Sequence, residues 1–214
     1  LYELMSGIKN IIFDLGGVIL NLNYKATKDA FEELGVKNFH QLYNQKEQTE
    51  LFNNFEKGII NSEKFISIFQ EITKLNKKQI IKAWNAMLLD IPRERLDFIL
   101  SLKKNYNTYL LSNTNEIHIE CFEAYLKNKG YLNLFKSCFN NIYYSCRIGD
   151  RKPNASCFNK VMNENKLSKE ETLFIDDSTQ HINKAKNMKI NTYLMEQNKS
   201  IIKLFPDIIQ QVHH

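Results

Sequence analysis

The hydrophobic residues of the chain follow two different patterns. Residues 8–15 form a short apolar run rich in β-branched side chains, which is typical of a buried strand that ends in a tight loop. From about residue 24 to residue 87 the apolar residues recur at three- and four-residue intervals, and this spacing predicts several helices in succession. The expected breaks between these helices are Gly35, Gly58 and Asn76.

After Pro92 the patterns of strand and helix alternate. Strands are predicted at 108–111, 142–146, 172–175 and 191–194, and helices at 93–105, 116–129, 153–165 and 180–188. Such alternation implies a parallel sheet with helices on both faces, and ligands bind such sheets at the carboxyl ends of the strands. We therefore expect an α/β fold with a Rossmann-like, doubly wound parallel sheet.

The length of the chain fits a core that carries an insertion. At roughly 150 residues per domain, 214 residues correspond to about 1.4 domains. Asp14 and Ser112 are 98 positions apart, whereas a strand-helix-strand crossover needs only about 30 residues. We expect a core of residues 5–20 and 91–212, with an all-helical cap of residues 21–90 inserted into it.

Composition and charge argue against several classes of protein. Hydrophobic residues make up 43% and charged residues 25% of the chain, as in ordinary globular proteins. No apolar run approaches the roughly 18 residues of a membrane span, and no signal segment is evident. The net charge of +5 comes from scattered lysines, so nucleic-acid binding is not expected. The four cysteines lack metal-site spacing, and we expect reduced thiols in a cytoplasmic protein.

Chemically active side chains occur where the predicted strands end or where the following helix begins. In chain order they are Asp14, Ser112, Asn113, Lys152, Asp176 and Asp177. Because the carboxyl ends of parallel strands meet at one edge of a sheet, we expect these side chains to lie together. A carboxylate, a hydroxyl, a lysine and a carboxylate pair suit a site that binds both an anion and a cation.

The residue types point to phosphoryl chemistry. Asp14 is suited to be a nucleophile, since carboxylate attack on a phosphoryl group splits hydrolysis into two displacements through an aspartyl-phosphate. Asp176 and Asp177, together with Asp14 and a backbone carbonyl, offer the oxygen ligands that Mg²⁺ favours. Lys152 would place a positive charge beside Asp14 and the phosphoryl group.

The neighbouring residues fit the same chemistry. Ser112 and backbone N–H groups at the start of the next helix are expected to hydrogen-bond a phosphoryl oxygen. Gly16 and Gly17 let the backbone approach metal and phosphate without a Cβ in the way. The alternative is purely structural, with a salt bridge between Lys152 and Asp176 and ordinary helix capping by Ser112 and Ser178.

With these motifs in this order, the sequence resembles the haloacid dehalogenase-like superfamily of hydrolases from residue 8 to about residue 195. It is most similar to the subgroup with a helical cap after the first strand, which includes α-D-glucose-1-phosphate phosphatases and the phosphatase domain of soluble epoxide hydrolase. The resemblance implies a nucleophile and metal ligand at Asp14, a carbonyl ligand at Gly16, a phosphate-binding turn at Ser112 and Asn113, the family lysine at Lys152, and the main acidic metal ligand at Asp177 with Asp176 beside it. His181 falls where the family more often has Asp or Asn.

Gly16 departs from the family pattern. Most phosphatases of the superfamily carry a second aspartate there, which protonates the leaving oxygen and then activates water. One hypothesis is a phosphatase for good leaving groups, such as the anomeric oxygen of a sugar 1-phosphate. The others are a 2-haloacid dehalogenase, whose halide needs no proton, and a catalytically silent binding or regulatory protein.

The retained nucleophile, lysine and acidic pair favour a Mg²⁺-dependent phosphatase that acts on a small phosphorylated metabolite. Substrate choice is expected to depend on the cap, because inserted helices at the strand ends can close over the site. The candidate cap residues are Tyr24, His40, Tyr43, Gln45 and Trp84, of which Trp84 is expected to belong to the packed core. The sequence does not indicate an oligomeric state.

Overall fold

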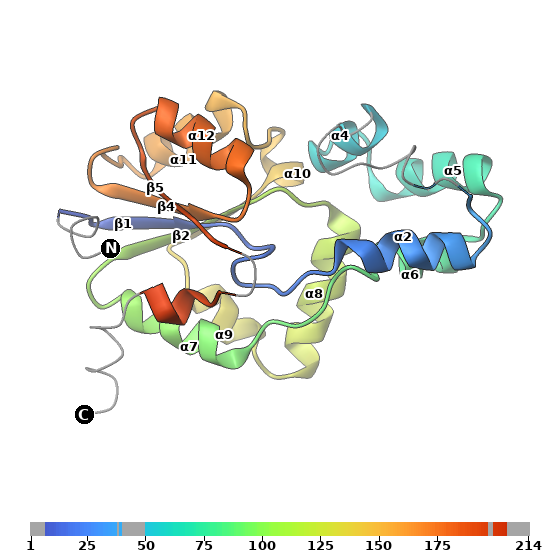
Figure 1. The fold of residues 1–214 in the computed structure, drawn as a ribbon, viewed down its shortest axis with the longest axis horizontal. Coiled ribbons are helices and arrows are strands. Elements are labelled where there is room, and N and C mark those ends of the chain that lie inside the picture. The colour runs from blue at the N-terminus through green and yellow to red at the C-terminus, as the bar shows by residue number, and fades with distance from the viewer. Residues whose placement is uncertain (1–6, 38, 40–49, 197–198, 205–214) are drawn as a thin grey trace.

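A parallel sheet lies at the centre of the protein. The computed structural model describes residues 7–37, 39, 50–196 and 199–204. Within these residues the sheet has five strands in the order β3-β2-β1-β4-β5 (Figure 1). The strands are β1 (Asn10–Phe13), β2 (Asn107–Ser112), β3 (Asn141–Tyr144), β4 (Thr172–Asp176) and β5 (Asn191–Leu194). The predicted Rossmann-like, doubly wound α/β fold is confirmed.

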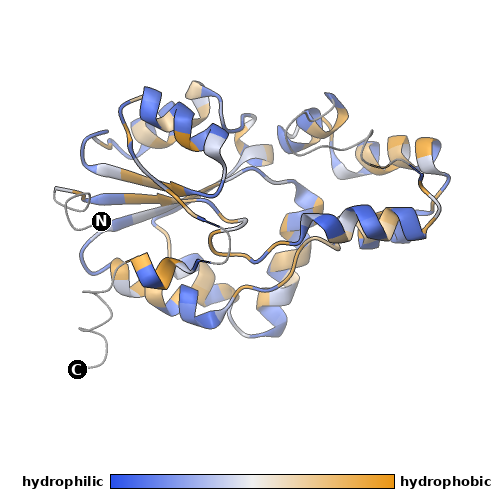
Figure 2. Cartoon of the chain, viewed as in Figure 1, coloured by the Kyte–Doolittle hydropathy of each residue, from blue (hydrophilic) through white to orange (hydrophobic). Residues whose placement is uncertain are grey.

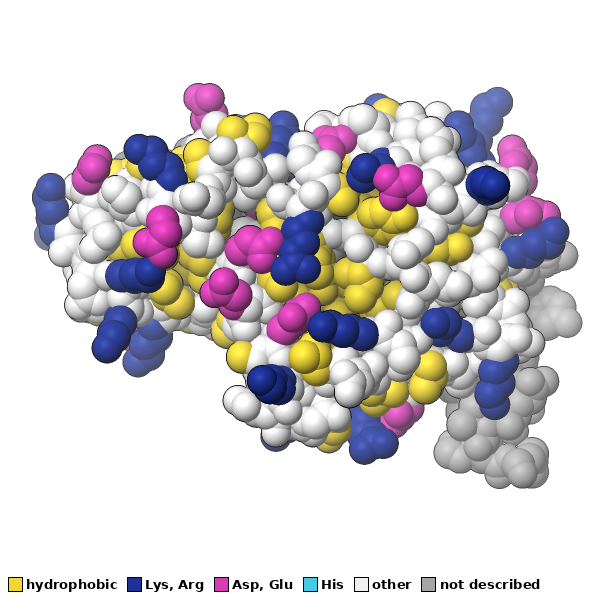
Figure 3. Space-filling view, turned by 180° about the vertical axis from the view of Figure 1, so that it is seen from behind, with side chains coloured by type: hydrophobic (Ala, Val, Ile, Leu, Met, Phe, Trp, Pro, Cys, Tyr) yellow, Lys and Arg dark blue, Asp and Glu magenta, His cyan; other side chains and the backbone are white. Residues whose placement is uncertain are grey.

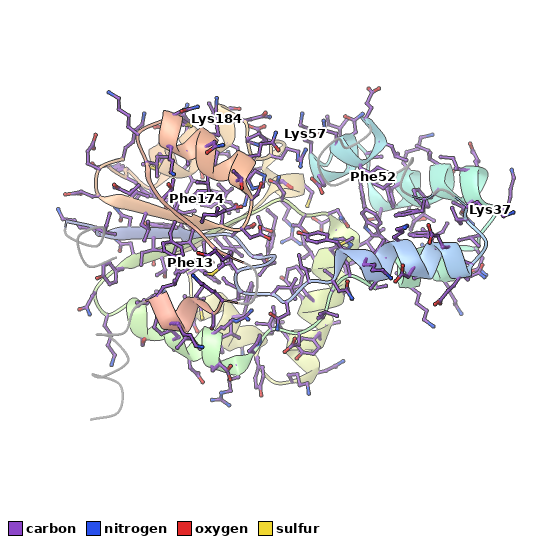
Figure 4. All side chains as sticks on the ribbon, in the orientation of Figure 1. Phe13, Lys37, Phe52, Lys57, Phe174 and Lys184 are labelled. Carbon is purple, nitrogen blue, oxygen red and sulfur yellow. The ribbon has the colours of Figure 1, made fainter. Side chains whose placement is uncertain are left out.

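Helices cover both faces of the sheet (Figure 1). One face carries α11 (Ala155–Glu164) and α12 (Thr179–Asn187), and the other carries α7 (Arg93–Leu102), α8 (Glu116–Asn128) and α9 (Leu132–Ser137), with the 3-10 helix η1 (Ile201–Leu204) against α7. Side chains alternate across a strand, so Phe13 joins the apolar cluster on one face and Ile12 the cluster on the other. Phe13 and Phe174 mark these two clusters in Figure 4. Burial on both sides explains why the last three residues of β1, Ile11, Ile12 and Phe13, are all apolar.

Among the residues that the structure describes between β1 and α7, four helices lie beyond the carboxyl ends of the strands (Figure 1). They are α2 (Tyr24–Glu33), α4 (Glu50–Glu56), α5 (Ser62–Thr73) and α6 (Lys77–Asn85). They share an aromatic cluster in which the rings of Phe55 and Phe65 stack at 4.1 Å and those of Phe52 and Trp84 at 5.3 Å. Trp84 is 2% exposed, so its expected place in packing is confirmed. We call these helices the cap; the boundaries 5–20, 21–90 and 91–212 remain a prediction.

Two neighbouring linkers join the cap to the sheet. Leu22, on the way into the cap, forms an antiparallel bridge with Leu88, on the way out. The N–H of Asn21 donates to the carbonyl of Asp90 at 2.9 Å, and the N–H of Leu89 donates to the carbonyl of Asn21 at 3.0 Å. The two connections of the chain between the cap and the sheet therefore run side by side.

The structure corrects one prediction and adds a helix that was not predicted. The strand expected at 142–146 ends at Tyr144, and Ser145 and Cys146 instead begin the short helix α10 (Ser145–Ile148). The Ser145 hydroxyl donates to the carbonyl of Thr114 at 3.0 Å and accepts from its N–H at 2.9 Å, which draws the chain out of the sheet. Helix α9 was not predicted, because six residues are too few to show a helical period.

The outer surface is polar and mixed in charge. Hydrophilic residues cover the outer sides of α2 and α12 (Figure 2), and Lys and Arg are interspersed with Asp and Glu over the face seen in Figure 3. No helix within the described residues is long and apolar enough to cross a membrane. All four cysteines are free thiols, as predicted.

Candidate active site

The register of the sheet brings Asp14 beside Asp176. Phe13 lies opposite Leu110 of β2 and Ile175 of β4, and the N–H of Asp14 donates to the carbonyl of Ile175 at 2.9 Å. Asp14 and Asp176 are the next residues along β1 and β4, so the two carboxylates leave the sheet at the same level. The expected meeting of the strand ends is thus present in the structure.

Lys152 lies between these two carboxylates. Its Nζ is 2.9 Å from Oδ1 of Asp14 and 2.6 Å from Oδ2 of Asp176, and its side chain is fully buried. Burial alone would lower the pKa of Lys152, but Asp14 and then Asp176 outweigh it and raise the pKa above its ordinary value. A buried ammonium is tolerated here because both carboxylates pair with it. The salt bridge expected as the structural alternative is present too, within the same cluster.

Asn113 holds the backbone of Lys152 in place. Its Oδ1 accepts from the Lys152 N–H and its Nδ2 donates to the Lys152 carbonyl, both at 2.9 Å. Ser112, at the end of β2, is 3% exposed and its hydroxyl makes a long contact of 3.5 Å to the carbonyl of Asn113. Asn113 therefore uses its amide to position the lysine, while the Ser112 hydroxyl makes a weak contact within the described part of the chain.

The three carboxylates of the site have different environments. Burial raises the pKa of Asp14 well above its ordinary value, against the opposing effect of Lys152. Burial, and then the charge of Asp176, raises the pKa of Asp177 to about 6. Burial also acts on Asp176, but Lys152 and His181 outweigh it and lower the pKa to about 2. One lysine thus faces more negative charge than it can neutralise.

His181 supports Asp176 from helix α12. Its Nδ1 lies 3.0 Å from both carboxylate oxygens, and the N–H of Ser178 donates to Oδ1 of Asp176 at 2.7 Å. Burial lowers the pKa of His181, so the ring is neutral and its Nδ1–H donates to the carboxylate. Asp14, Asp176 and His181 bring possible metal-ligand atoms within 4.8 Å of one another. The sequence showed that His181 departs from the family pattern but did not indicate this contact.

The two glycines that follow Asp14 have different surroundings. Gly17 has a φ of +71°, and a Cβ there would lie 2.2 Å from Oδ2 of Asp177. At Gly16 a Cβ would lie 2.6 Å from Cδ1 of Leu22. The end of the flexible Leu22 side chain would therefore have to move aside for a side chain at position 16.

A cavity of about 130 Å³ opens over these residues, between the strand ends and the cap. Its core side includes Asp14, Ser112, Asn113, Asp177 and His181, and its cap side includes Tyr24, Glu56 and Met87. Tyr24 is thus the predicted cap residue that reaches the cavity, whereas His40, Tyr43 and Gln45 lie outside the described residues. Glu56, Arg151 and His118 also line the cavity and were not assigned a role from the sequence, since no motif links the cap helices to the strand ends.

The sequence profile of haloacid dehalogenase-like hydrolases matches residues 11–195. The chain belongs to this family. It is 30% identical over 193 residues to the D-ribitol-5-phosphate phosphatase of Bacteroides thetaiotaomicron, covering 88% of this chain and 92% of that one. The predicted family and the prediction of a hydrolase are both confirmed.

Solved structures of family members resemble this hydrolase closely. One is an Asp-to-Ala mutant of a Bacteroides thetaiotaomicron family enzyme in complex with magnesium and inorganic phosphate. It is 33% identical, with a TM-score of 0.85, and the match covers 92% of this chain and 98% of that chain. A predicted family hydrolase from Porphyromonas gingivalis is 29% identical with a TM-score of 0.82, over 97% and 98% of the two chains.

Proposed function

We propose that the protein is a Mg²⁺-dependent phosphatase that hydrolyses a small phosphate monoester, a sugar or polyol phosphate, with Asp14 as the nucleophile. The observation that carries this proposal is the buried cluster of Asp14, Lys152 and Asp176 at the edge of the cavity. The relative named D-ribitol-5-phosphate phosphatase and the relative crystallised with magnesium and phosphate support it.

The donor set fits a magnesium ion. Asp14, Asp176 and Asp177 place three carboxylates at one edge of the sheet with Lys152 as the cation between two of them. Hard oxygen ligands of this kind suit Mg²⁺, and a divalent cation would offset their excess negative charge. Asp14, Asp177 and the carbonyl of Gly16 would hold the ion, while Asp176, already bonded to Lys152 and His181, would position the others. When bound, Mg²⁺ neutralises charge on the nucleophile and on the phosphoryl oxygens.

The geometry suggests how Asp14 acts. Its Oδ1 accepts from the N–H of Leu15 at 2.7 Å and pairs with Lys152, so Oδ2 is the oxygen placed to attack phosphorus. Attack forms an Asp14–phosphorus bond and breaks the bond to the leaving oxygen, and water then releases phosphate from Asp14. Lys152 and Ser112 stabilise the charge that develops on the phosphoryl oxygens.

The leaving oxygen receives no proton from position 16. Because Gly16 has no side chain, the proton must come from water or from another group in the cavity. An acidic leaving group, such as the anomeric oxygen of a sugar 1-phosphate, would need this proton least. The substrate of the named relative is a 5-phosphate, so both positions of the phosphate belong in the test.

The same cluster argues against the dehalogenase and the silent protein. A carboxylate-rich cavity without a cation would repel a 2-halo acid, and a silent site has no need for a lysine buried between two carboxylates. The proposed partner is a small phosphorylated metabolite rather than a nucleic acid or a membrane, and the free cysteines are consistent with the proposed cytoplasmic location.

A panel of phosphate monoesters, assayed with Mg²⁺ and with EDTA, tests the proposal. The panel contains D-ribitol 5-phosphate, glucose 1-phosphate, glucose 6-phosphate and p-nitrophenyl phosphate. We expect phosphate release that needs Mg²⁺ and that Asp14→Asn reduces by at least about 10³-fold, because the nucleophile is lost. Turnover that survives EDTA, or that Asp14→Asn retains, would contradict the proposal. Faster cleavage of glucose 6-phosphate than of glucose 1-phosphate would contradict the sugar 1-phosphate hypothesis alone.

A further inference from the structure

Among its described residues, the cap contributes the acidic side chain of Glu56 to the wall of the cavity. Glu56 is the last residue of α4 and is 9% exposed, and it lines the same cavity as Asp14 and Ser112. The end of α4 lies on the side of the cap that faces the core, as the neighbouring Lys57 shows in Figure 4. Glu56 thus reaches the cavity from the side opposite the strand ends.

Contacts with the core hold Glu56 in this place. Its Oε2 is 2.9 Å from Nε of Arg151, and the side chains of the pair are 12% and 17% exposed. Nη1 of Arg151 also donates to Oδ1 of Asn53, one turn earlier on α4, at 3.0 Å. A planar guanidinium that contacts two residues of one helix limits the positions that the Glu56 carboxylate can adopt.

The charge of Glu56 indicates which part of a substrate it would meet. A carboxylate repels a phosphoryl dianion, and the phosphoryl end of the cavity already has its cation in Lys152. An ionised carboxylate is purely an acceptor, so its natural partners are hydroxyl or amine donors. The substrate proposed above carries hydroxyl groups on the carbon chain that leaves, and these would extend away from Asp14 toward the cap.

We propose that Glu56 is a specificity-determining residue that accepts hydrogen bonds from the hydroxyl groups of the leaving sugar or polyol, with Arg151 holding it in position. This inference rests on the proposed phosphatase function and names the substrate feature that the cap recognises. A leaving group without hydroxyls cannot donate a hydrogen bond to the Glu56 carboxylate, whereas a polyhydroxylated leaving group can.

Substrate discrimination by Glu56→Gln tests the inference. The variant keeps the size of the side chain and removes its charge. We expect kcat/KM for D-ribitol 5-phosphate to fall roughly 10- to 100-fold, since hydrogen bonds to charged groups contribute that much, while kcat/KM for p-nitrophenyl phosphate stays within about twofold. The control is Glu63→Gln, which removes a cap glutamate that pairs with Lys77 at the surface and should change neither value.

Binding separates this role from a purely structural one. In the Asp14→Asn background with Mg²⁺, calorimetry should show weaker binding of D-ribitol 5-phosphate by Glu56→Gln and equal binding of inorganic phosphate. Glu56→Asp keeps the charge on a shorter side chain. It should lower the ratio of kcat/KM for D-ribitol 5-phosphate to kcat/KM for p-nitrophenyl phosphate by less than Glu56→Gln does. It replaces Glu56→Gln in the test if that variant does not fold. An equal fall in kcat/KM for D-ribitol 5-phosphate and p-nitrophenyl phosphate, or no fall for either, would overturn the proposed role of Glu56 alone. Failure of the wild-type protein to hydrolyse either ester would overturn the proposed function and the subsite with it.

Discussion

Lys152 shows how a single buried residue limits the chemistry of the whole site. Its ammonium group has no exposure to solvent, so its charge is stable only while Asp14 and Asp176 remain beside it. The same pairing keeps Asp14 in one orientation at the floor of the cavity. Stability and function therefore depend on the same contacts, and a substitution at any of the three residues affects both.

Gly17→Ala should impair the site more than the fold. The substitution adds a Cβ in a backbone conformation with φ +71° and only 2.2 Å from Oδ2 of Asp177, which must then move. We expect a loss of about 1–2 kcal/mol in unfolding free energy and at least about a tenfold fall in kcat. Gly130→Ala is the matched control, because Gly130 has φ +75° with no atom within 4 Å of an added Cβ. Equal kcat for the two variants would contradict the proposed closeness of Asp177 to the reaction.

The sequence was sufficient to predict the residues that stand at the strand ends. Asp14, Ser112 and Asp176 each follow a local pattern of strand and turn, and parallel strands bring such positions together in any doubly wound sheet. Lys152 was predicted from its place before a helix, and it lies between α10 and α11. The roles of these residues within the cluster were not predictable, since they depend on contacts: the sequence could not show that the Asn113 amide holds the backbone of Lys152.

At the scale of secondary-structure elements, the cap meets the core where α4 approaches α10. Gly58, just after α4, has φ +66°, and a Cβ there would lie 2.1 Å from the carbonyl oxygen of Cys146. This close approach of two backbones places the end of α4, and with it Glu56, over the cavity. The sequence predicted Gly58 as a helix break. It did not predict the contact with Cys146, 88 residues later, because neither segment contains a motif that indicates it.

Gly58→Ala should push α4 away from α10. Because the added Cβ would collide with backbone rather than with a flexible side chain, the cap must shift, and we expect KM for a hydrolysed polyol phosphate to rise at least about fivefold. Gly35→Ala introduces the same kind of backbone strain in the cap, at φ +87°, without any atom within 4 Å of the new Cβ. Steady-state kinetics of both variants provide the comparison, and an unchanged KM in Gly58→Ala would contradict this account of the contact.

At the scale of the whole molecule, His118 of α8 ties the core to the cap. Its ring stacks on Trp84 of α6 at 5.1 Å, and its Nε2 donates to the Trp84 carbonyl at 3.2 Å, while Nδ1 accepts from Nδ2 of Asn115. This arrangement uses the neutral ring. Burial lowers the pKa of His118 to about 4, although the bond to Trp84 partly opposes the shift.

The pH dependence of stability should report this contact. An unfolded histidine has a pKa of about 6.5, so between pH 6.5 and pH 4 the unfolded chain binds a proton that the folded protein does not. Stability therefore falls as pH decreases through this window, by about 3 kcal/mol from His118. Denaturant unfolding at several pH values, with His118→Gln compared with wild type, measures the effect. If the unfolding free energy of the two proteins changed equally with pH, His118 would not be the source of the pH dependence.

The fold class was predictable from the alternating patterns of strand and helix. The presence of a cap was also predictable, but the cap residues that line the cavity were not. Helical spacing between the first and second strands indicated an inserted cap, but the cavity residues that come from it, such as Tyr24 and Glu56, carry no motif. Trp84 was correctly assigned to packing because its spacing matched the apolar face of a helix.

The surroundings of Gly16 bear on how a site of this kind could change its chemistry. An aspartate gained at position 16 would meet only the end of the flexible Leu22 side chain, whose Cδ1 lies 2.6 Å from the position of an added Cβ and would have to move aside. Gly17, the next residue along the chain, has no such freedom, because its backbone conformation at φ +71° is one that side chains rarely adopt. Of the two glycines, Gly16 is therefore the one at which a proton donor could be gained by a single substitution.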